Sequence, residues 1–289
     1  MANILVTGAN GQLGSEIRAL AAAYPQHRFL FSDRDEVDIT DPQQVAACFA
    51  GFEPAFCVNC AAYTAVDKAE TDQDAAFQIN ATAVKNLASA STQYGTRFLH
   101  VSTDYVFDGK GTAPYKEDHP PAPASVYGLT KLQGEQEALA ANADVIIIRT
   151  SWVYSQYGHN FVKTMLRLMQ SRPEVGVVAD QWGAPTYAAD LAEAILQIID
   201  SGKWERGIYH YANAGAITWY DFAQAIKELS NVACHVKAIT TAEYPTPTQR
   251  PAYSVMDMEK IRQVYGINPK DWKDSLQVCL EKLRAAQQA

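Results

Sequence analysis

The first half of the chain alternates short apolar runs with longer segments in which apolar residues recur every three or four positions. Near-continuous apolar runs are typical of parallel strands that are covered by helices on both faces. Five such runs predict strands, at residues 2–9, 27–33, 55–62, 96–103 and 143–152.

Helical patterns separate these strands, at residues 11–23, from Asp41-Pro42 onward, at 75–91 and at 127–141. Asp41 is a typical helix N-cap, and Pro42 suits the first helical position. Strand–helix–strand repetition predicts an α/β fold built on a doubly wound parallel sheet.

After residue 152 the alternation is looser. Helices are predicted at 160–170, 188–200 and 271–287, a strand at 206–213, and a proline-rich segment occupies 244–251. We interpret residues 1–152, rejoined by 187–213, as one domain. Residues 153–186 and 214–289 then form a smaller lobe over the carboxyl ends of the strands, where such sheets bind ligands.

Composition narrows the classes of function. The 289 residues are 48% hydrophobic, enough for a substantial core, and the net charge of −8 argues against a general nucleic-acid binder. The sequence has no membrane-length apolar stretch and no basic signal-peptide start, and its five cysteines are scattered, so we expect a cytoplasmic protein. Cys57 and Cys60 lie on a predicted strand, pointing to opposite faces, and are interpreted as small core residues.

A glycine-rich loop, Gly8-Ala9-Asn10-Gly11-Gln12-Leu13-Gly14, joins the first strand to the first helix. Glycines at this spacing allow a tight turn and close approach of a pyrophosphate to the helix N-terminus, as in a Rossmann-type NAD(P)-binding domain. Asp33, at the end of the second strand, is placed to hold a ribose hydroxyl and favours NAD, whereas the adjacent Arg34 favours NADP. We therefore expect both NADH and NADPH to be used.

The fourth strand ends in an unusually polar segment, Ser102-Thr103-Asp104-Tyr105, before an Asp-Gly turn at 108–109. These side chains either cap a turn or hold a substrate. Further along, Tyr127 and Lys131 lie four residues apart at the start of a helix, on the same face. A nearby cation and a helix N-terminus would lower the pKa of a phenol, as acid–base catalysis requires.

The glycine loop, the polar strand end and the Tyr-x-x-x-Lys pair occur in the order used by extended short-chain dehydrogenases/reductases, which this sequence resembles. "VNCAAYTAVDKAE", "STDYVFDG", "VYGLTKLQGE", "RTSWVY", "NFVKTMLRL", "DQWGAPT" and "PTPTQRP" narrow the resemblance to the dTDP-4-dehydrorhamnose reductase family, along nearly the whole chain. It implies reduction of a dTDP-4-keto sugar, the last step of dTDP-L-rhamnose synthesis for cell-surface polysaccharide.

The resemblance also implies roles for individual residues. Thr103, Tyr127 and Lys131 are the expected catalytic set, and the polar strand end is expected to face the substrate through Thr103, Asp104 and Trp152. Arg250 is either a partner of the substrate diphosphate or an arginine that stabilises the smaller lobe. The cofactor is expected to contact Gly8, Gly11, Gln12, Leu13, Asp33, Arg34, Asp38, Ile39, Ala62, Tyr63, Thr64, Val101, Tyr127 and Lys131.

Some family members pair into homodimers through Mg²⁺ held by surface carboxylates. Glu16 could be one ligand, but Ala189 and Lys282 stand where the others are expected, so an ordinary exposed helix glutamate is the favoured interpretation. His100, His159 and His210 have no metal-type spacing and are expected to be structural. Asn160 and Gln181 are candidates for lining the pocket, which the sequence alone does not decide.

Two alternative functions remain open. Nucleotide-sugar epimerases and dehydratases share the fold and the Tyr/Lys pair, although a dehydratase would be expected to carry an acid pair here, and Asp104 is followed by Tyr105. The regulatory subunit of methionine adenosyltransferase also resembles this family and acts chiefly by binding a partner. The intact Thr103, Tyr127 and Lys131 favour catalysis.

Overall fold

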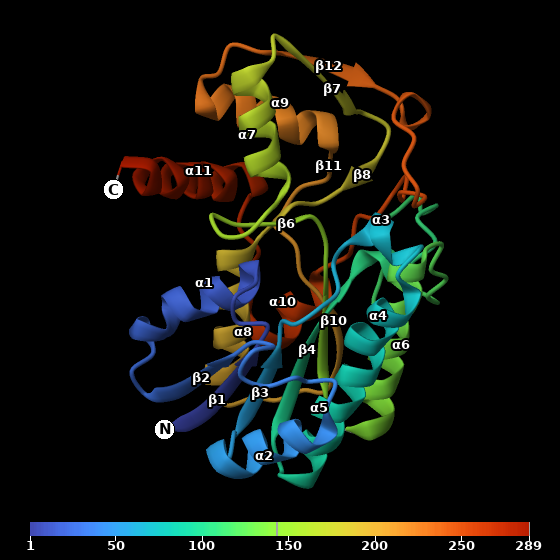
Figure 1. Cartoon of the computed structure of the whole chain (residues 1–289). Coiled ribbons are helices and arrows are strands. Elements are labelled where there is room, and N and C mark those ends of the chain that lie inside the picture. The colour runs from blue at the N-terminus through green and yellow to red at the C-terminus, as the bar shows by residue number, and fades with distance from the viewer. Residues whose placement is uncertain (143, 289) are drawn as a thin grey trace.

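The computed structural model describes residues 1–142 and 144–288, which form two lobes, one above the other in Figure 1. The larger lobe is built on a six-stranded sheet with the order β10-β5-β4-β3-β1-β2, in which every pair is parallel. This arrangement confirms the predicted α/β fold with a doubly wound sheet. Its strands are β1 (Ala2–Thr7), β2 (His27–Ser32), β3 (Phe56–Asn59), β4 (Arg97–Thr103), β5 (Ile146–Thr150) and β10 (Gly207–His210).

Several strands end a few residues before the predicted apolar runs do. The residues after the last backbone hydrogen bond between neighbouring strands belong to the loops over the sheet. Ala143, the first residue of the predicted strand 143–152, lies outside the described residues. Helices α1 (Gln12–Leu20) and α8 (Ala188–Asp200) cover one face of the sheet, and α2 (Pro42–Phe52), α5 (Ala83–Gln93) and α6 (Val126–Ala141) pack on the other. Apolar side chains of alternating strand positions fill both layers.

The predicted helix 75–91 is interrupted. It consists of α4 (Gln73–Phe77), a π-helical turn at Gln78–Thr82, and α5. Asn80 in this turn accepts a hydrogen bond from the Tyr63 N–H at 2.8 Å and donates to Thr130 Oγ1 at 3.0 Å. A π turn often marks a functional position, and here it brings a buried amide against the start of α6.

The smaller lobe gathers around a separate core rich in aromatic residues. Its helices are α7 (Phe161–Ser171), α9 (Trp219–Ser230) and α11 (Trp272–Gln288). The strands pair only in twos, as β7 (Glu174–Val178) with β12 (His235–Ile239), β8 (Trp182–Gly183) with β11 (Ile217–Thr218), and β6 (Val153–Tyr154) with β9 (Thr186–Tyr187).

The remaining short elements are α3 (Val66–Ala69), α10 (Glu259–Tyr265) and three 3₁₀ turns at Ala21–Ala23, Asp104–Val106 and Thr241–Glu243. Ile261 of α10 is fully buried in the core of the larger lobe. The segment around α10 therefore packs on the large sheet, although the sequence placed all of 214–289 in the smaller lobe. Helix α10 is short, and its apolar pattern shows that one face is buried but does not show which lobe that face contacts.

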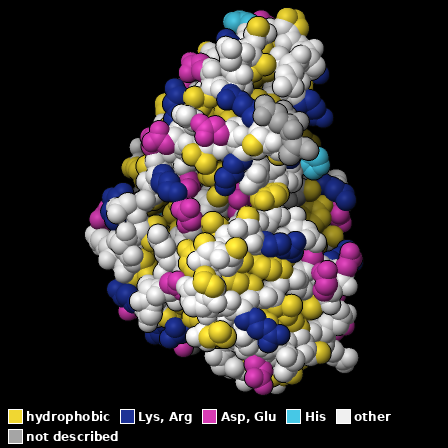
Figure 2. Space-filling view, turned by 90° about the vertical axis from the view of Figure 1, so that its left-hand side faces the viewer, with side chains coloured by type: hydrophobic (Ala, Val, Ile, Leu, Met, Phe, Trp, Pro, Cys, Tyr) yellow, Lys and Arg dark blue, Asp and Glu magenta, His cyan; other side chains and the backbone are white. Residues whose placement is uncertain are grey.

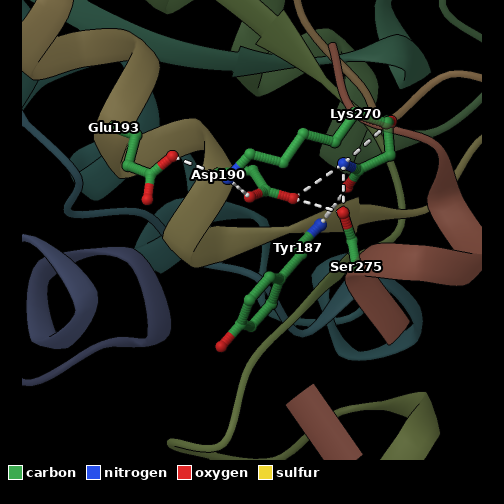
Figure 3. A network of polar contacts seen from close by, with 6 residues as sticks. Tyr187, Asp190, Glu193, Lys270 and Ser275 are labelled. Atoms are coloured by element: carbon green, nitrogen blue, oxygen red, sulfur yellow. Dashed lines mark hydrogen bonds and ion pairs between the residues drawn. The ribbon is translucent and has the colours of Figure 1, made fainter. Parts of the chain in front are cut away.

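A buried polar network ties the chain segments that pass between the lobes (Figure 3). The Asp190 carboxylate accepts hydrogen bonds from Ser275 Oγ at 2.5 Å and Asn213 Nδ2 at 2.8 Å, and pairs with Lys270 Nζ at 2.8 Å. Asn213 in turn accepts from the backbone N–H of Tyr187 at 2.7 Å. One carboxylate thus holds together the beginning of α8, the end of β10 and the approach to α11.

The surface carries mixed charges. Figure 2 shows one side of the molecule, where Lys and Arg lie among Asp and Glu, and hydrophobic side chains gather over the lower part, which belongs to the larger lobe. Among the described residues, every helix is too short or too polar to span a membrane.

Candidate active site

A cleft of about 890 Å³ opens at the carboxyl ends of the strands of the large sheet. This is where parallel α/β sheets bind ligands. The cleft brings together all but one of the residues expected to contact a cofactor: Gly8, Gly11, Gln12, Leu13, Asp33, Arg34, Asp38, Ile39, Ala62, Thr64, Val101, Tyr127 and Lys131.

The glycine loop has the shape that a pyrophosphate cradle needs. Gly8 has φ +65°, and a Cβ at this position would lie 2.5 Å from the backbone N of Ala61. A Cβ on Gly14 would lie 2.5 Å from Gly8 O, so the third glycine lets α1 pack closely on the loop. Within the described structure, α1 begins after Gly11 without a side-chain cap, which leaves its first N–H groups directed at the cleft wall. These residues fit a dinucleotide.

Asp33 joins the second strand to the glycine loop. Its carboxylate accepts hydrogen bonds from the backbone N–H of Asn10 at 2.9 Å and of Arg34 at 2.8 Å. The neighbouring Asp38 accepts from both the hydroxyl and the N–H of Thr40, and these bonds hold its pKa below the usual value. The adenosine end of the cleft therefore contains two fixed carboxylates beside the exposed guanidinium of Arg34.

Tyr63 is the one expected cofactor-binding residue that does not line the cleft. Its hydroxyl donates to Asp72 Oδ2 at 3.1 Å, and its ring packs in a small cluster with Tyr127 and Ala76. The Asn80 amide of the π turn holds its backbone. Because this turn cannot be recognised from helical periodicity, the direction of the Tyr63 side chain could not be predicted.

Of the three expected catalytic residues, Tyr127 and Lys131 line the cleft, and Thr103 lies beside them, hydrogen-bonded to Tyr127. Thr103 ends β4, while Tyr127 and Lys131 occupy the first turns of α6, whose N-cap is the Ser125 hydroxyl, bonded to the Gly128 N–H. Burial raises the pKa of Tyr127, and the Thr103 side chain opposes this rise through a hydrogen bond. The expected lowering of the phenol pKa is therefore wrong for this structure, because desolvation outweighs the neighbouring groups.

The polar strand end does cap a turn. Thr103 Oγ1 accepts from the N–H of Tyr105 at 3.2 Å and donates to Asp104 Oδ1 at 3.0 Å, at the start of the 3₁₀ turn 104–106. Burial raises the pKa of Asp104 to about 6, against hydrogen bonds from Ser254 and Thr103 that favour the carboxylate. The two interpretations of this segment do not exclude each other, since a capped turn can also present its side chains to a ligand.

Trp152 and Arg250 lie at the junction of the lobes. Trp152, with φ +48°, stacks on Trp219 of α9 with ring centroids 3.6 Å apart. Arg250 pairs with Asp67 at 2.7 Å and donates to the Tyr105 hydroxyl at 3.1 Å. It thus joins the proline-rich segment to α3 and to the polar strand end, and it also lines a second, smaller pocket.

The structure adds Gly158, which sequence reasoning missed, and His159, which was expected to be structural: both line the cleft from the smaller lobe. Asn160, a candidate lining residue, donates to Gln12 Oε1 at 2.9 Å across the junction. Gln181 bonds Thr241 instead. Other lining residues without a predicted role, such as Ser32 and Cys60, lie near the carboxyl ends of the predicted strands 27–33 and 55–62, and this position was the available signal.

Glu16 is not the exposed glutamate that was expected. It is 1% exposed and accepts a hydrogen bond from the Ser155 hydroxyl at 2.6 Å. Its partner lies in a distant loop, so its burial has no local signature in the sequence. Lys282 lies over the Tyr187 ring at 5.5 Å, and the described part of the chain has no group of three His, Cys, Asp or Glu placed to hold a metal.

The sheet order, the glycine cradle, and the Tyr and Lys of the cleft with a neighbouring Thr define an oxidoreductase of the extended short-chain dehydrogenase/reductase class. Comparison with known proteins narrows this class. Residues 1–285 match the family model described as "RmlD substrate binding domain". The chain is 45% identical to a dTDP-4-dehydrorhamnose reductase of Aggregatibacter actinomycetemcomitans over 96% of its own length and 97% of the relative's.

Solved structures agree. A dTDP-4-dehydrorhamnose reductase of Clostridium acetobutylicum has a TM-score of 0.94 at 41% identity, covering 98% of this chain and 99% of that one. A Bacillus anthracis dTDP-4-dehydrorhamnose reductase in complex with NADP also has a TM-score of 0.94, at 37% identity, covering 97% and 99%. The chain belongs to the dTDP-4-dehydrorhamnose reductase family.

Proposed function

We propose that the protein reduces the 4-keto group of dTDP-4-dehydro-L-rhamnose to give dTDP-L-rhamnose, using NADPH or NADH. The observation that carries this proposal is the large cleft, whose walls combine a dinucleotide cradle with Tyr127 and Lys131, the former hydrogen-bonded to Thr103. Its family membership supports the same reaction. The expected residue roles, the dTDP-sugar specificity, a homodimer and a cytoplasmic location are parts of this proposal.

A bound nicotinamide supplies the hydride for such a reduction. Tyr127 donates a proton to the carbonyl oxygen as general acid. Since burial raises its pKa, this phenol keeps its proton at neutral pH until negative charge develops on the substrate oxygen. The Thr103 hydroxyl orients that oxygen, and the buried amine of Lys131 holds the cofactor ribose.

On the substrate side, Asp104 and Trp152 hold the sugar. Trp152 is the second residue after β5 and Asp104 the first after β4, and these neighbouring strands end at the same edge of the sheet. Arg250 exchanges part of its contact with Asp67 for the diphosphate, because a guanidinium can serve both carboxylate and phosphate.

A direct assay tests the proposal. The purified chain, given dTDP-4-dehydro-L-rhamnose, should oxidise NADPH and form dTDP-L-rhamnose. Tyr127→Phe keeps the ring and its edge contact with Tyr105, and should lower kcat by about 100-fold or more with little change in NADPH affinity. Interconversion of nucleotide sugars without net NADPH oxidation would instead indicate an epimerase. Cofactor binding without turnover on any keto sugar would favour a regulatory binding protein.

A further inference from the structure

A row of three polar side chains crosses the sheet behind the cleft. Thr7, Asn59 and His100 are register partners on the adjacent strands β1, β3 and β4, so their side chains lie on one face of the sheet, the face that α6 covers. Each is at most 2% exposed. The row leads from the residue before the glycine loop to Lys131.

The orientation of the Asn59 amide is determined by a backbone group. The N–H of Ala61, which can only donate, lies 3.1 Å from Asn59 Oδ1, and the Thr7 hydroxyl donates to the same oxygen at 2.7 Å. The amide nitrogen therefore faces the other way, towards His100 Nδ1 at 3.0 Å. An amide nitrogen can only donate.

This donor determines the tautomer of His100. Burial, and then the charge of Lys131, lower the pKa of His100 well below its ordinary value, so the ring is neutral. Its Nδ1 accepts from Asn59, and the ring proton must then be on Nε2. Nε2 lies 3.4 Å from Lys131 Nζ.

An N–H of His100 thus faces the Lys131 amine. A protonated Lys131 has three donors and no acceptor, so it cannot accept this hydrogen, whereas the neutral amine can accept it with its lone pair. Lys131 also donates to Val101 O at 2.7 Å, a bond that both of its protonation states can make.

The surroundings of Lys131 both lower and raise its pKa. Burial lowers the pKa of Lys131 to about 8, and the carboxylate of Glu135, one turn along α6, opposes this, as does Cys60 at the end of β3. Glu135 is itself engaged by the buried Arg149 at 2.6 Å and by the Ser102 hydroxyl at 2.5 Å. The remaining titratable neighbour on α6 is Tyr127, one turn before Lys131.

We propose that His100 is a positioning residue for Lys131: the Thr7–Asn59–His100 row holds a ring N–H against its amine and favours release of the lysine proton into the cleft. This inference rests on the proposed role of Lys131 in the reduction. Tyr127 loses one proton to the substrate oxygen, Lys131 supplies the proton that restores the phenol, and solvent returns one to Lys131. His100 keeps its proton throughout.

The tautomer can be measured without any turnover. In protein labelled with ¹⁵N in the histidine rings, the His100 signals, identified by their absence from His100→Phe, should show a neutral ring protonated on Nε2 at pH 7. An Nδ1-protonated or charged His100 would overturn the inference.

Asn59→Asp tests the row by reversing the tautomer of His100. One carboxylate oxygen still accepts the Ala61 N–H, and the other accepts from His100 Nδ1, so the proton moves to Nδ1 and Nε2 can accept from the ammonium of Lys131. The decline of kcat at alkaline pH should then move upward by about one pH unit or more. The matched control is Phe98→Leu, which changes an apolar neighbour of the His100 ring and should leave both the tautomer and the pH profile unchanged.

Two further variants separate the ring N–H from the charge introduced by Asn59→Asp. His100→Phe removes the N–H without adding charge and should also move the alkaline decline to higher pH. His100→Gln retains both an acceptor for Asn59 and a donor for Lys131, and should restore a profile close to that of the wild type. A wild-type profile in His100→Phe, or equal shifts in the Phe and Gln variants, would overturn the proposal.

The two proposals fail in different ways. If the protein does not reduce the keto sugar, the proposed function fails, while the ring signals of His100 still report its tautomer. If the protein is active and Lys131→Met abolishes turnover, but His100 carries its proton on Nδ1, only the inference about His100 fails.

Discussion

The two lobes are held together by different kinds of interaction. The larger lobe has one continuous parallel sheet whose backbone bonds run through six strands, with apolar layers on both faces. In the smaller lobe the strands pair only in twos, and stacked aromatic rings such as Trp152 on Trp219 and Phe161 on Phe222 make up much of the core. The larger lobe thus owes its shape mainly to the backbone, and the smaller lobe mainly to particular side chains.

This difference matters for function. The dinucleotide cradle is made of backbone N–H groups and glycines at the end of the continuous sheet, so it tolerates changes in neighbouring side chains. The substrate side depends on how the smaller lobe is placed over the sheet. We therefore expect single side-chain changes at the junction to alter stability and substrate handling more than cofactor binding.

The largest effect is expected at the junction network. Asp190→Ala leaves Asn213, Ser275 and Lys270 without their shared acceptor and should lower the free energy of unfolding by about 2 kcal/mol. Urea denaturation measures this. Glu193→Ala is the matched control, since this half-exposed carboxylate binds the same lysine and should cost less than about 0.5 kcal/mol. Equal losses in the two variants would mean that the buried network does not join the lobes.

Trp152→Ala tests whether the junction of the lobes affects substrate binding more than cofactor binding. It should raise KM for the dTDP-keto sugar about tenfold, equivalent to about 1.4 kcal/mol, while NADPH binds normally. Trp219→Ala removes the stacking partner and is the control: it should lower stability with a smaller change in KM. If both variants raise KM equally, Trp152 acts through packing alone.

Asp104 links stability to pH. Its raised pKa, about 6, means that the folded protein binds this proton more tightly than the unfolded chain does. The associated stability is present below the unfolded pKa near 4 and is lost as the pH rises through about 6. Asp104→Asn should therefore gain about 1 kcal/mol relative to the wild type between pH 4 and pH 7.5, measured by urea denaturation at both values. A difference that stays constant over this range would contradict the raised pKa.

Asp104→Ala separates the two roles of the strand end. A residue that only supports the turn would cost about 1 kcal/mol of stability on removal, with intact kinetics. A residue that holds the sugar would raise KM or lower kcat, while NADPH binding stays unchanged. Thermal melting and steady-state kinetics on the same variant distinguish these outcomes.

The smallest effect is expected in the adenosine part of the cleft. Both cofactors should support reduction with catalytic efficiencies within about tenfold of each other, and Asp33→Ala should shift the ratio towards NADPH by relieving repulsion of the 2′-phosphate. The exposed Asp35→Ala, two residues further on, is the control and should leave the ratio unchanged. An inert NADH or NADPH, or an unchanged ratio in Asp33→Ala, would contradict this assignment.

Local sequence patterns were enough to predict the parallel sheet and most of the cofactor site of this protein. Apolar runs of strand length, separated by helical segments, predicted the parallel sheet, because burial on both faces demands apolar residues throughout a strand. The glycine spacing and the Tyr127–Lys131 interval each lie within a few residues, so backbone geometry alone places their members together. The cleft brings together thirteen of the fourteen residues expected to contact the cofactor.

Only the tertiary structure decided what depends on distant contacts. Glu16 is buried because Ser155, 139 residues away, reaches it, and Arg250 is paired because Asp67, 183 residues away, lies beside it. The tautomer of His100 follows from an amide on the neighbouring strand. Such pairings leave no periodic trace in the sequence, because they arise only when packing of the apolar layers has brought the strands and lobes together.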